Sequence, residues 1–243
     1  LSEEKTINRV ALFVFIVVIV LFSFGSFSYN DFFWHLSLGK WMIVTQQFLT
    51  HDIFSHTFEG KLWLNNTWLF DGTLYLLYAS TKIWGLSVLR LAIFGTTYFF
   101  LYKTIRLTSK APLLIILCGL LLTIPAIRNF LRPEITSPLF ASVFLYALYA
   151  YKEKKSRLIF LLPFIEVIWV NTHGGFTLGL ILVGIFLAAE ALRSLIEHRQ
   201  NILLILREKN IIVLGVVLAL TGAATLINPY GITVYKLLYE ILA

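Results

Sequence analysis

Cysteine is almost absent from this sequence. The single thiol, Cys118, excludes an internal disulfide and a metal centre built from cysteines, and we expect it to serve packing. The chain also has no glycine-rich phosphate loop of the P-loop or Rossmann type, and no internal repeat. Disulfide scaffolds, zinc ribbons and the common nucleotide-dependent enzymes are therefore not candidate classes.

Charge is scarce as well. Only 14% of the residues are charged, 58% are hydrophobic and the mean hydropathy is +0.82, whereas soluble domains carry about 25% charged residues. The composition therefore predicts a membrane protein. The net charge of +7 is not arranged as a basic stripe interleaved with aromatic residues, so we expect membrane lipids as partners and no nucleic acid.

Apolar runs bounded by charge predict about seven membrane-spanning helices, because crossing about 30 Å of hydrocarbon takes roughly 20 residues. The runs cover residues 10–28, 86–104, 111–126, 135–151, 158–170, 176–192 and 211–227. Two of them are short and contain Pro125 and Pro163, so we expect broken or tilted helices there. The predicted fold is an all-α polytopic membrane helical bundle.

We expect residues 1–243 to form a single transmembrane module. Its first helix has the features of a signal anchor that is retained rather than cleaved. The segment 235–243 has the character of a helix that has just begun, so we expect further chain downstream.

The distribution of basic residues predicts the orientation. Thirteen of the twenty Lys and Arg residues fall in segments 5–9, 103–110, 152–157 and 193–209, which would share one side of the membrane. By the positive-inside rule this side is cytoplasmic. We therefore expect a cytoplasmic N-terminus in the cytoplasmic (inner) membrane of a bacterium, with the functional loops on the outer face.

The unusual polar residues gather in the loops of the opposite side. They lie in a long first outer loop of about residues 29–84 and in three shorter segments, 128–134, 171–175 and 228–231. Several loops that meet at one face of a helical scaffold are a common way to build a binding or active site. The outer face is thus the predicted position of the site.

Two amphipathic helices are predicted in the long loop, over residues 31–47 and about 66–80, with tryptophans placed for the membrane interface. Asp31 stands at the start of the first helix. Its simplest role there is to cap the helix by accepting backbone N–H bonds. The alternative is a catalytic carboxylate.

Histidines follow two acids of this loop at a spacing of four residues. His35 follows Asp31, and His56 follows Asp52. Such pairs can contribute ligands to a divalent metal site, but spacing alone favours interface histidines that bind neighbouring acids. A divalent metal is therefore possible and not favoured, and no metal ligand is assigned.

Further candidates for substrate binding occur in the shorter segments. Arg128 and Arg132, close to Glu134, suit bidentate binding of a head-group phosphate, with snorkelling or an Arg132–Glu134 salt bridge as the alternative. Glu166 falls inside an apolar run, where an ionisable group is normally partnered or functional.

Asn171 and His173 precede a Gly-Gly pair, and Tyr230 lies in an Asn-Pro-Tyr-Gly sequence. Both segments are compatible with backbone that approaches a ligand. Tight turns are the alternative reading for both. The candidate substrate-binding residues are therefore Arg128 and Arg132 together with His35, His56, Glu134, Asn171, His173 and Tyr230.

The sequences DFFWHLSLGKW, HDIFSHTFEGKLWLNNTWL, RPE, WVNTHGGF and NPYG, in this order, resemble uncharacterised bacterial membrane proteins related to the GT-C superfamily of integral-membrane glycosyltransferases. The layout is similar over nearly the whole chain, with one span followed by a long outer loop. Distant members of that superfamily include protein mannosyltransferases and aminoarabinose transferases.

The resemblance implies a polyprenyl-phosphate-linked sugar as donor and Asp31 as general base, or metal ligand, for an acceptor hydroxyl. Asp52 becomes the second catalytic acid, and Arg128 or Arg132 would hold the lipid phosphate. The chain departs from the family pattern in two respects: Asn30 replaces one member of the usual Asp-Glu pair, and the chain has few spans.

The leading functional hypothesis is sugar transfer from a lipid-linked donor at the outer face. The alternative is a non-catalytic subunit of a larger membrane protein complex that retains this fold and packs against partner subunits. A transporter is less favoured, because interrupted helices do not form two matching halves.

Overall fold

The computed structural model describes residues 2–24, 30–108, 131–198, 207–236 and 239. This part of the chain is helical, and it contains one isolated antiparallel bridge, between His51 and Leu62, and no named strand. The predicted all-α class is confirmed. The apolar run 111–126 and Cys118 lie outside the described residues.

The chain divides into two compact units. The first unit comprises Leu1–Gln47 and Trp68–Tyr146, and the second comprises Phe48–Thr67 and Ala147–Ala243. The long loop predicted at about residues 29–84 therefore contributes to both units. Its helical ends belong to the first unit, and its irregular middle belongs to the second.

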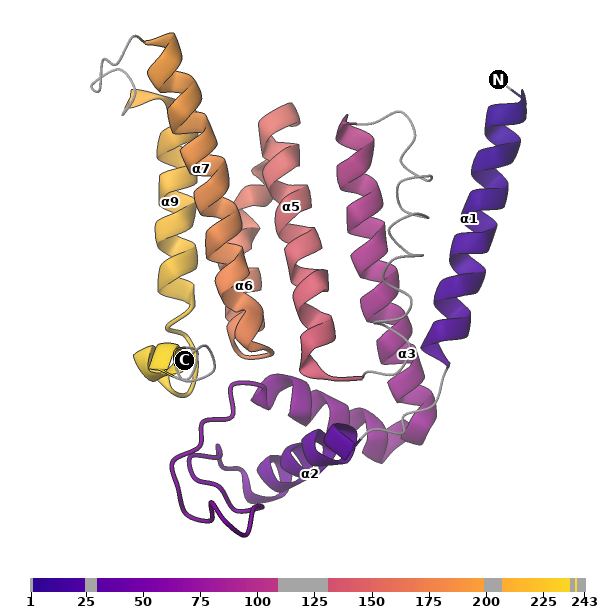
Figure 1. The fold of residues 1–243 in the computed structure, drawn as a ribbon, viewed down its shortest axis with the longest axis vertical. Helices are drawn as coiled ribbons and strands as arrows, with labels where there is room; N and C mark the ends of the chain where they lie inside the picture. Colours follow the sequence, from indigo (N-terminus) through magenta and orange to yellow (C-terminus); the bar gives the residue numbers. More distant parts are fainter. Residues whose placement is uncertain (1, 25–29, 109–130, 199–206, 237–238, 240–243) are drawn as a thin grey trace. The chain divides into compact units, whose positions relative to one another are not determined.

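The first unit is built around one long helix (Figure 1). Its elements are α1 (Ser2–Ser23), α2 (Asn30–Thr45), α3 (Trp68–Thr108), the 3-10 turn η1 (Pro133–Ile135) and the beginning of α5 (Thr136–Lys154). Helices α1 and α2 both pack against α3. The predicted interfacial helix 31–47 corresponds to α2.

Helix α3 combines two predicted elements. The interfacial helix expected at 66–80 and the span expected at 86–104 form one element, interrupted at Lys82, whose φ of 55° and ψ of −139° are not helical. A lysine in the left-handed region breaks the ladder of helical hydrogen bonds at that point. The helix is therefore kinked at Lys82, although its two halves are continuous in sequence.

Aromatic and aliphatic side chains join the helices of the first unit. The ring of Phe15 in α1 meets Tyr98 in α3 edge-on, with centroids 5.6 Å apart. Phe32 of α2 packs in a second cluster with Phe70 and Leu74 of α3, which Leu131 also joins. Residue 131 is thereby anchored to the α2–α3 pair.

The second unit packs α9 against two other helices (Figure 1). Its elements are η2 (Arg157–Leu161), α6 (Leu162–Val170), η3 (Gly174–Phe176), α7 (Thr177–Glu197), α9 (Lys209–Ala224) and η4 (Gly231–Thr233). The run predicted at 158–170 is indeed broken, into η2 and α6. Pro163 stands in the first turn of α6, where its missing N–H has no helical partner to lose.

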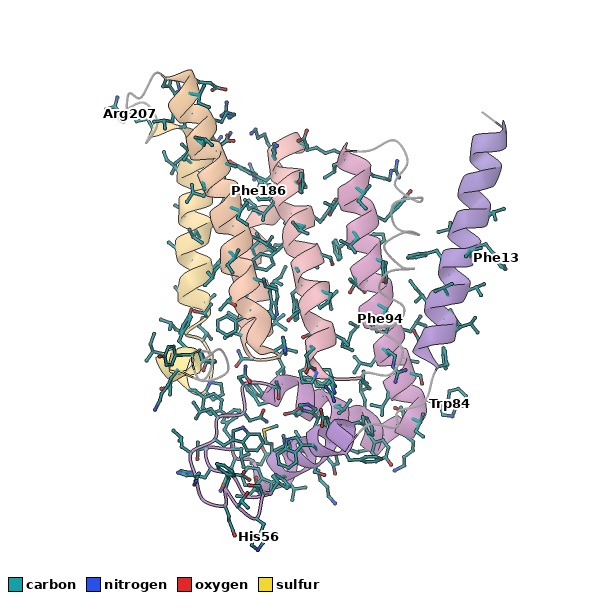
Figure 2. All side chains as sticks on the ribbon, in the orientation of Figure 1. Phe13, His56, Trp84, Phe94, Phe186 and Arg207 are labelled. Atoms are coloured by element: carbon teal, nitrogen blue, oxygen red, sulfur yellow. The ribbon has the colours of Figure 1, made fainter. Side chains whose placement is uncertain are left out.

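Two helical stretches of the described chain are long and apolar enough to cross a membrane, Trp68–Leu107 and Gly174–Glu197. Leu12–Leu21 and Lys209–Ala224 are apolar but shorter. Only 17% of the most apolar window of Gly174–Glu197 is buried inside the protein, so its apolar surface is open to its surroundings. The aromatic rings of Phe13 and Trp84, labelled in Figure 2, are also exposed.

Hydroxyl groups in the apolar helices donate to the carbonyl four residues earlier. Examples are Ser23 to Ile19 at 2.7 Å and Thr97 to Ile93 at 2.7 Å. Such bonds satisfy a buried hydroxyl without water or a partner helix. These helices are therefore compatible with apolar surroundings despite their polar residues.

Candidate functional site

Asp31 forms an ion pair with Arg132 in the first unit. Asp31 lies in the first turn of α2, which begins one residue earlier, so it is not the capping residue. Arg132 has an extended backbone and stands between Leu131 and Pro133, both buried. Arg132 thus forms a long-range pair that the sequence analysis did not predict, and exposed Glu134 lies beside it in η1.

The Asp31–Arg132 pair is accessible to solvent or a ligand. The side chains of Asp31 and Arg132 are 51% and 26% exposed. A carboxylate that faces a guanidinium at an open position can exchange its partner for another anion or for a hydroxyl group. The pair is therefore suited to a reaction that needs both groups.

His35 contacts a different acid. Its Nδ1 lies 2.7 Å from Oδ1 of Asp71, at the start of α3. The Asp71 side chain is fully buried and that of His35 is 16% exposed. The ring of Phe70 stands edge-on to the imidazole, with centroids 6.1 Å apart. Helix α2 thus presents Asp31 and His35 one turn apart, each bound to a residue from another segment.

Asp71 is the principal residue that the sequence analysis missed. No spacing rule relates it to His35 across 36 positions of sequence. The available signal was its place at the start of an amphipathic helix, in Trp-Leu-Phe-Asp.

Close approach of two helices makes the His35–Asp71 contact possible. A Cβ at Gly39 would lie 2.9 Å from the Cβ of Tyr75, and closer still to the carbonyl group of Asp71. Only glycine leaves space for this contact between α2 and α3. Gly39 therefore sets the distance between the helices that carry His35 and Asp71.

This geometry argues against Asp31 and His35 as joint ligands of one metal. Each of them binds a separate partner, an arginine and a buried aspartate respectively. Within the described residues, no three His, Cys, Asp or Glu side chains gather to hold a metal ion.

Asp52 belongs to the second unit and binds its own loop. Its Oδ1 accepts from the backbone N–H groups of Phe54 and Ser55 at 2.8 and 2.9 Å, and its Oδ2 accepts from the Ser55 hydroxyl at 2.6 Å. The Ser55 hydroxyl and these backbone bonds hold the pKa of Asp52 below its usual value. His56 is exposed at the tip of the loop (Figure 2), and no helix relates it to Asp52. The catalytic role of Asp52 stays a prediction.

The predicted residues of the two short segments hold the second unit together. Asn171 donates to the carbonyl of Ile227 at 2.8 Å, and the Tyr230 hydroxyl donates to the carbonyl of Leu49 at 3.0 Å. His173 precedes η3, and its Nδ1 accepts from the N–H of Gly175 at 3.0 Å. The turn interpretation fits these contacts. Arg128, the remaining candidate from the short segments, lies outside the described residues.

Glu166 is fully buried in α6, which packs against α9. Among the described residues neither of its carboxylate oxygens has a hydrogen-bond partner, and the same holds for the hydroxyl of Thr221 in α9. A buried polar group without a partner costs stability unless it serves another purpose.

A second polar cluster joins α7 to the start of α9, and the sequence analysis did not single it out. Arg193 contacts Glu190 at 2.9 Å, Glu197 at 2.7 Å and Glu208 at 3.2 Å. Glu208 also accepts from the Ser194 hydroxyl at 2.6 Å, and this bond, above the others, lowers its pKa. The spacing of three and four residues around Arg193 was the sequence signal.

No protein-family model, no curated protein and no solved structure matches this chain.

Proposed function

We propose that this chain is a membrane glycosyltransferase module that transfers a sugar from a polyprenyl-phosphate-linked donor to an acceptor hydroxyl. The observation that carries the proposal is the Asp31–Arg132 ion pair. Asp31, the candidate general base, lies on a helix that follows the first apolar helix, and it contacts Arg132, the candidate phosphate-binding cation. This is the position of the acid in the superfamily that the sequence resembles.

In this reaction the acceptor oxygen forms a bond to the anomeric carbon, and the bond between that carbon and the phosphate oxygen breaks. The proton of the hydroxyl passes to the Asp31 carboxylate. The bonding electrons leave with the polyprenyl phosphate, and the guanidinium of Arg132 stabilises its charge. The donor phosphate replaces Asp31 as the partner of Arg132, which leaves the carboxylate able to accept the proton.

Asp71 and His35 have a positioning role in the proposal. The buried carboxylate of Asp71 fixes the imidazole of His35 one helical turn from Asp31. Because the pair is largely shielded from water, it restrains α2 against α3. His35 is also close enough in sequence to contact a sugar that lies against Asp31.

The membrane setting of the proposal is a bundle of about seven spans in the cytoplasmic membrane, with the N-terminus inside. Two helices long and apolar enough to span support it, as do the exposed apolar faces. Asp31 then lies at the outer face, where a polyprenyl-phosphate sugar flipped from the cytoplasm would be available.

The test uses the full-length protein in vesicles that contain polyprenyl-phosphate sugars and measures transfer of labelled sugar. We expect Asp31→Asn to lower the rate by about a hundredfold to ten-thousandfold, the usual contribution of a general base, without weakening donor binding. Arg132→Gln should weaken donor binding, whereas Lys61→Gln, at an exposed lysine over the Phe58 ring, should leave it unchanged.

Retained transfer in Asp31→Asn would show that the base is another residue. If the wild type binds no polyprenyl phosphate, the alternative is favoured: a non-catalytic subunit of a membrane complex. The same ion pair supports that alternative, because Arg132 then serves as a clasp that holds residues 131–135 against α2.

A further inference from the structure

A cavity with three cations opens in the second unit, at the ends of helices that the proposed reaction does not use. It has a volume of about 290 Å³ and is bordered by the end of α5, the start of η2 and the start of α9. Lys155, Arg157 and Lys209 supply one cation from each segment, and no acidic residue lies among its described lining residues. We call it the basic cavity.

The backbone places Lys155 at the edge of this cavity. Lys155 directly follows α5 and lies in the left-handed region with φ 53°. Its N–H donates to the carbonyl of Tyr151 at 2.9 Å, and the N–H of Ser156 donates to the carbonyl of Ala150 at 3.2 Å. The bond from Lys155 to Tyr151 is that of a helix C-terminus of the αL type. The chain then turns at once into η2, so that Arg157 reaches the same cavity.

Asn210 orders the cavity from the opposite side. Its Oδ1 accepts from the Lys155 ammonium at 3.1 Å and from the Tyr151 hydroxyl at 3.2 Å, and the ammonium lies 5.3 Å from the centre of the Tyr151 ring. The Asn210 Nδ2 donates to Glu190 at 2.5 Å. The hydrogen bond of Lys155 is to a neutral amide, and the nearby Glu190 carboxylate, which Asn210 also contacts, offsets part of its charge.

The acids nearest in sequence and space do not line the basic cavity. Glu208, which precedes Lys209, contacts Arg193, Ser194 and His198. Glu190 lines a neighbouring cavity together with Arg193, and these two side chains form an ion pair there. The neighbouring cavity shares Lys155 with the basic cavity and contains one acid, whereas the basic cavity has three cations and no acid among its described lining residues.

An apolar stripe leaves the basic cavity along α6. Phe160 lines the cavity from η2 and is 45% exposed, and Phe164 and Ile168, four residues apart in α6, are 71% and 48% exposed. Residues at this spacing share one face of a helix. The buried residues of α6, including Trp169, lie on its other face. A ligand with an anionic head and long apolar chains complements both parts.

We propose that the basic cavity binds the phosphate of an anionic phospholipid, with the acyl chains against Phe160 and Phe164. Arg157 and Lys209 contact the phosphate, and Lys155 and Asn210 orient the glycerol end. This site is separate from the Asp31–Arg132 pair and holds a lipid that is not a substrate.

The experiment measures binding of phosphatidylglycerol and phosphatidylcholine to the detergent-solubilised full chain by native mass spectrometry. Arg157→Gln/Lys209→Gln removes two cavity charges. Lys154→Gln/Arg207→Gln removes two exposed charges from the same loops without touching the cavity, and Arg207 is labelled in Figure 2. We expect the cavity variant to bind phosphatidylglycerol about twenty-five-fold more weakly, from a contribution of about fivefold for each of the two basic residues. The control should remain within about twofold of wild type.

Arg157→Lys keeps the charge and should retain most of the phosphatidylglycerol binding. This variant tests the role of charge even if the cavity variant folds poorly. Phe164→Ser should weaken binding of the lipid but not of soluble glycerol 3-phosphate. Equal binding of both lipids, or equal losses in the cavity and control variants, would overturn the proposal. Binding of glycerol 3-phosphate as tight as that of phosphatidylglycerol would identify a free phosphate compound as the ligand, and would overturn it too.

Discussion

Two side-chain pairs, His35–Asp71 and Asp31–Arg132, connect α2 to other segments, and their contributions to stability can be compared. His35–Asp71 joins a largely buried imidazole to a fully buried carboxylate, whereas Asp31–Arg132 is half open to solvent. The perturbation is a double-mutant cycle at each pair: His35→Ala and Asp71→Ala, alone and together, and Asp31→Ala and Arg132→Ala in the same way.

The expected magnitudes follow from burial. A hydrogen bond to a charged group that is shielded from water contributes about 1.5–3 kcal/mol. An exposed ion pair contributes about 0–1 kcal/mol, because water screens it and both side chains lose conformational entropy. We therefore expect the coupling free energy of His35–Asp71 to exceed that of Asp31–Arg132 by about 1 kcal/mol or more.

The assay is equilibrium unfolding of the detergent-solubilised protein, followed by tryptophan fluorescence and circular dichroism. The cycle isolates the coupling because each single variant removes one partner and the double variant removes both. The Asp31–Arg132 cycle serves as the matched control, since both cycles start from the same helix.

Equal coupling at the two pairs would refute the reasoning. It would mean that burial of Asp71 does not strengthen its contact with His35. A large coupling at Asp31–Arg132 alone would make that pair the structural clasp and would weaken its assignment to catalysis.

Three further predictions concern packing, burial and pH. Gly39→Ala should destabilise the protein by about 1–3 kcal/mol, because the added methyl overlaps the Asp71 carbonyl. Gly95→Ala, with open space at its Cβ, should not destabilise it. Similar losses of stability for the two variants in thermal unfolding would contradict this prediction. Glu166→Met should raise the unfolding temperature, since it replaces an unpartnered buried carboxyl with an apolar side chain of similar volume; a fall would reveal a partner or a function for the carboxyl. The pKa of Glu208 is lowered from its unfolded value of 4.5, mainly by the hydrogen bond from Ser194. The contribution of Glu208 to the free energy of unfolding is therefore complete above about pH 4.5 and is lost as the pH falls through the lower folded pKa. Glu208→Gln should abolish this part of the pH dependence of unfolding, and an unchanged pH profile would exclude the contribution.

Local patterns were sufficient to predict most helices of the described chain. Helix α2 and the break at Pro163 both depend on residues within a few positions of one another, because a helical hydrogen bond spans four residues. The kink at Lys82 was not predicted. Its backbone conformation is unusual for a lysine, and no neighbouring residue signals it.

The candidate site shows the opposite situation. The sequence analysis selected Asp31, His35 and Arg132 from their types and their places beside apolar runs. It paired Asp31 with His35 as possible ligands, since they share a helix face. The folded chain instead gives each a separate partner, and it adds Asp71, which no local rule connects to His35.

The sequence by itself determined the helical class, the apolar character and the choice of the first acid to test. Composition and periodicity are properties of a segment, so they can be read without the fold. Only the tertiary structure decided which charges meet. The ion pair of Asp31, the burial of Asp71 and the three cations of the basic cavity depend on contacts across 36 to 101 positions of sequence, and packing of whole helices sets those distances.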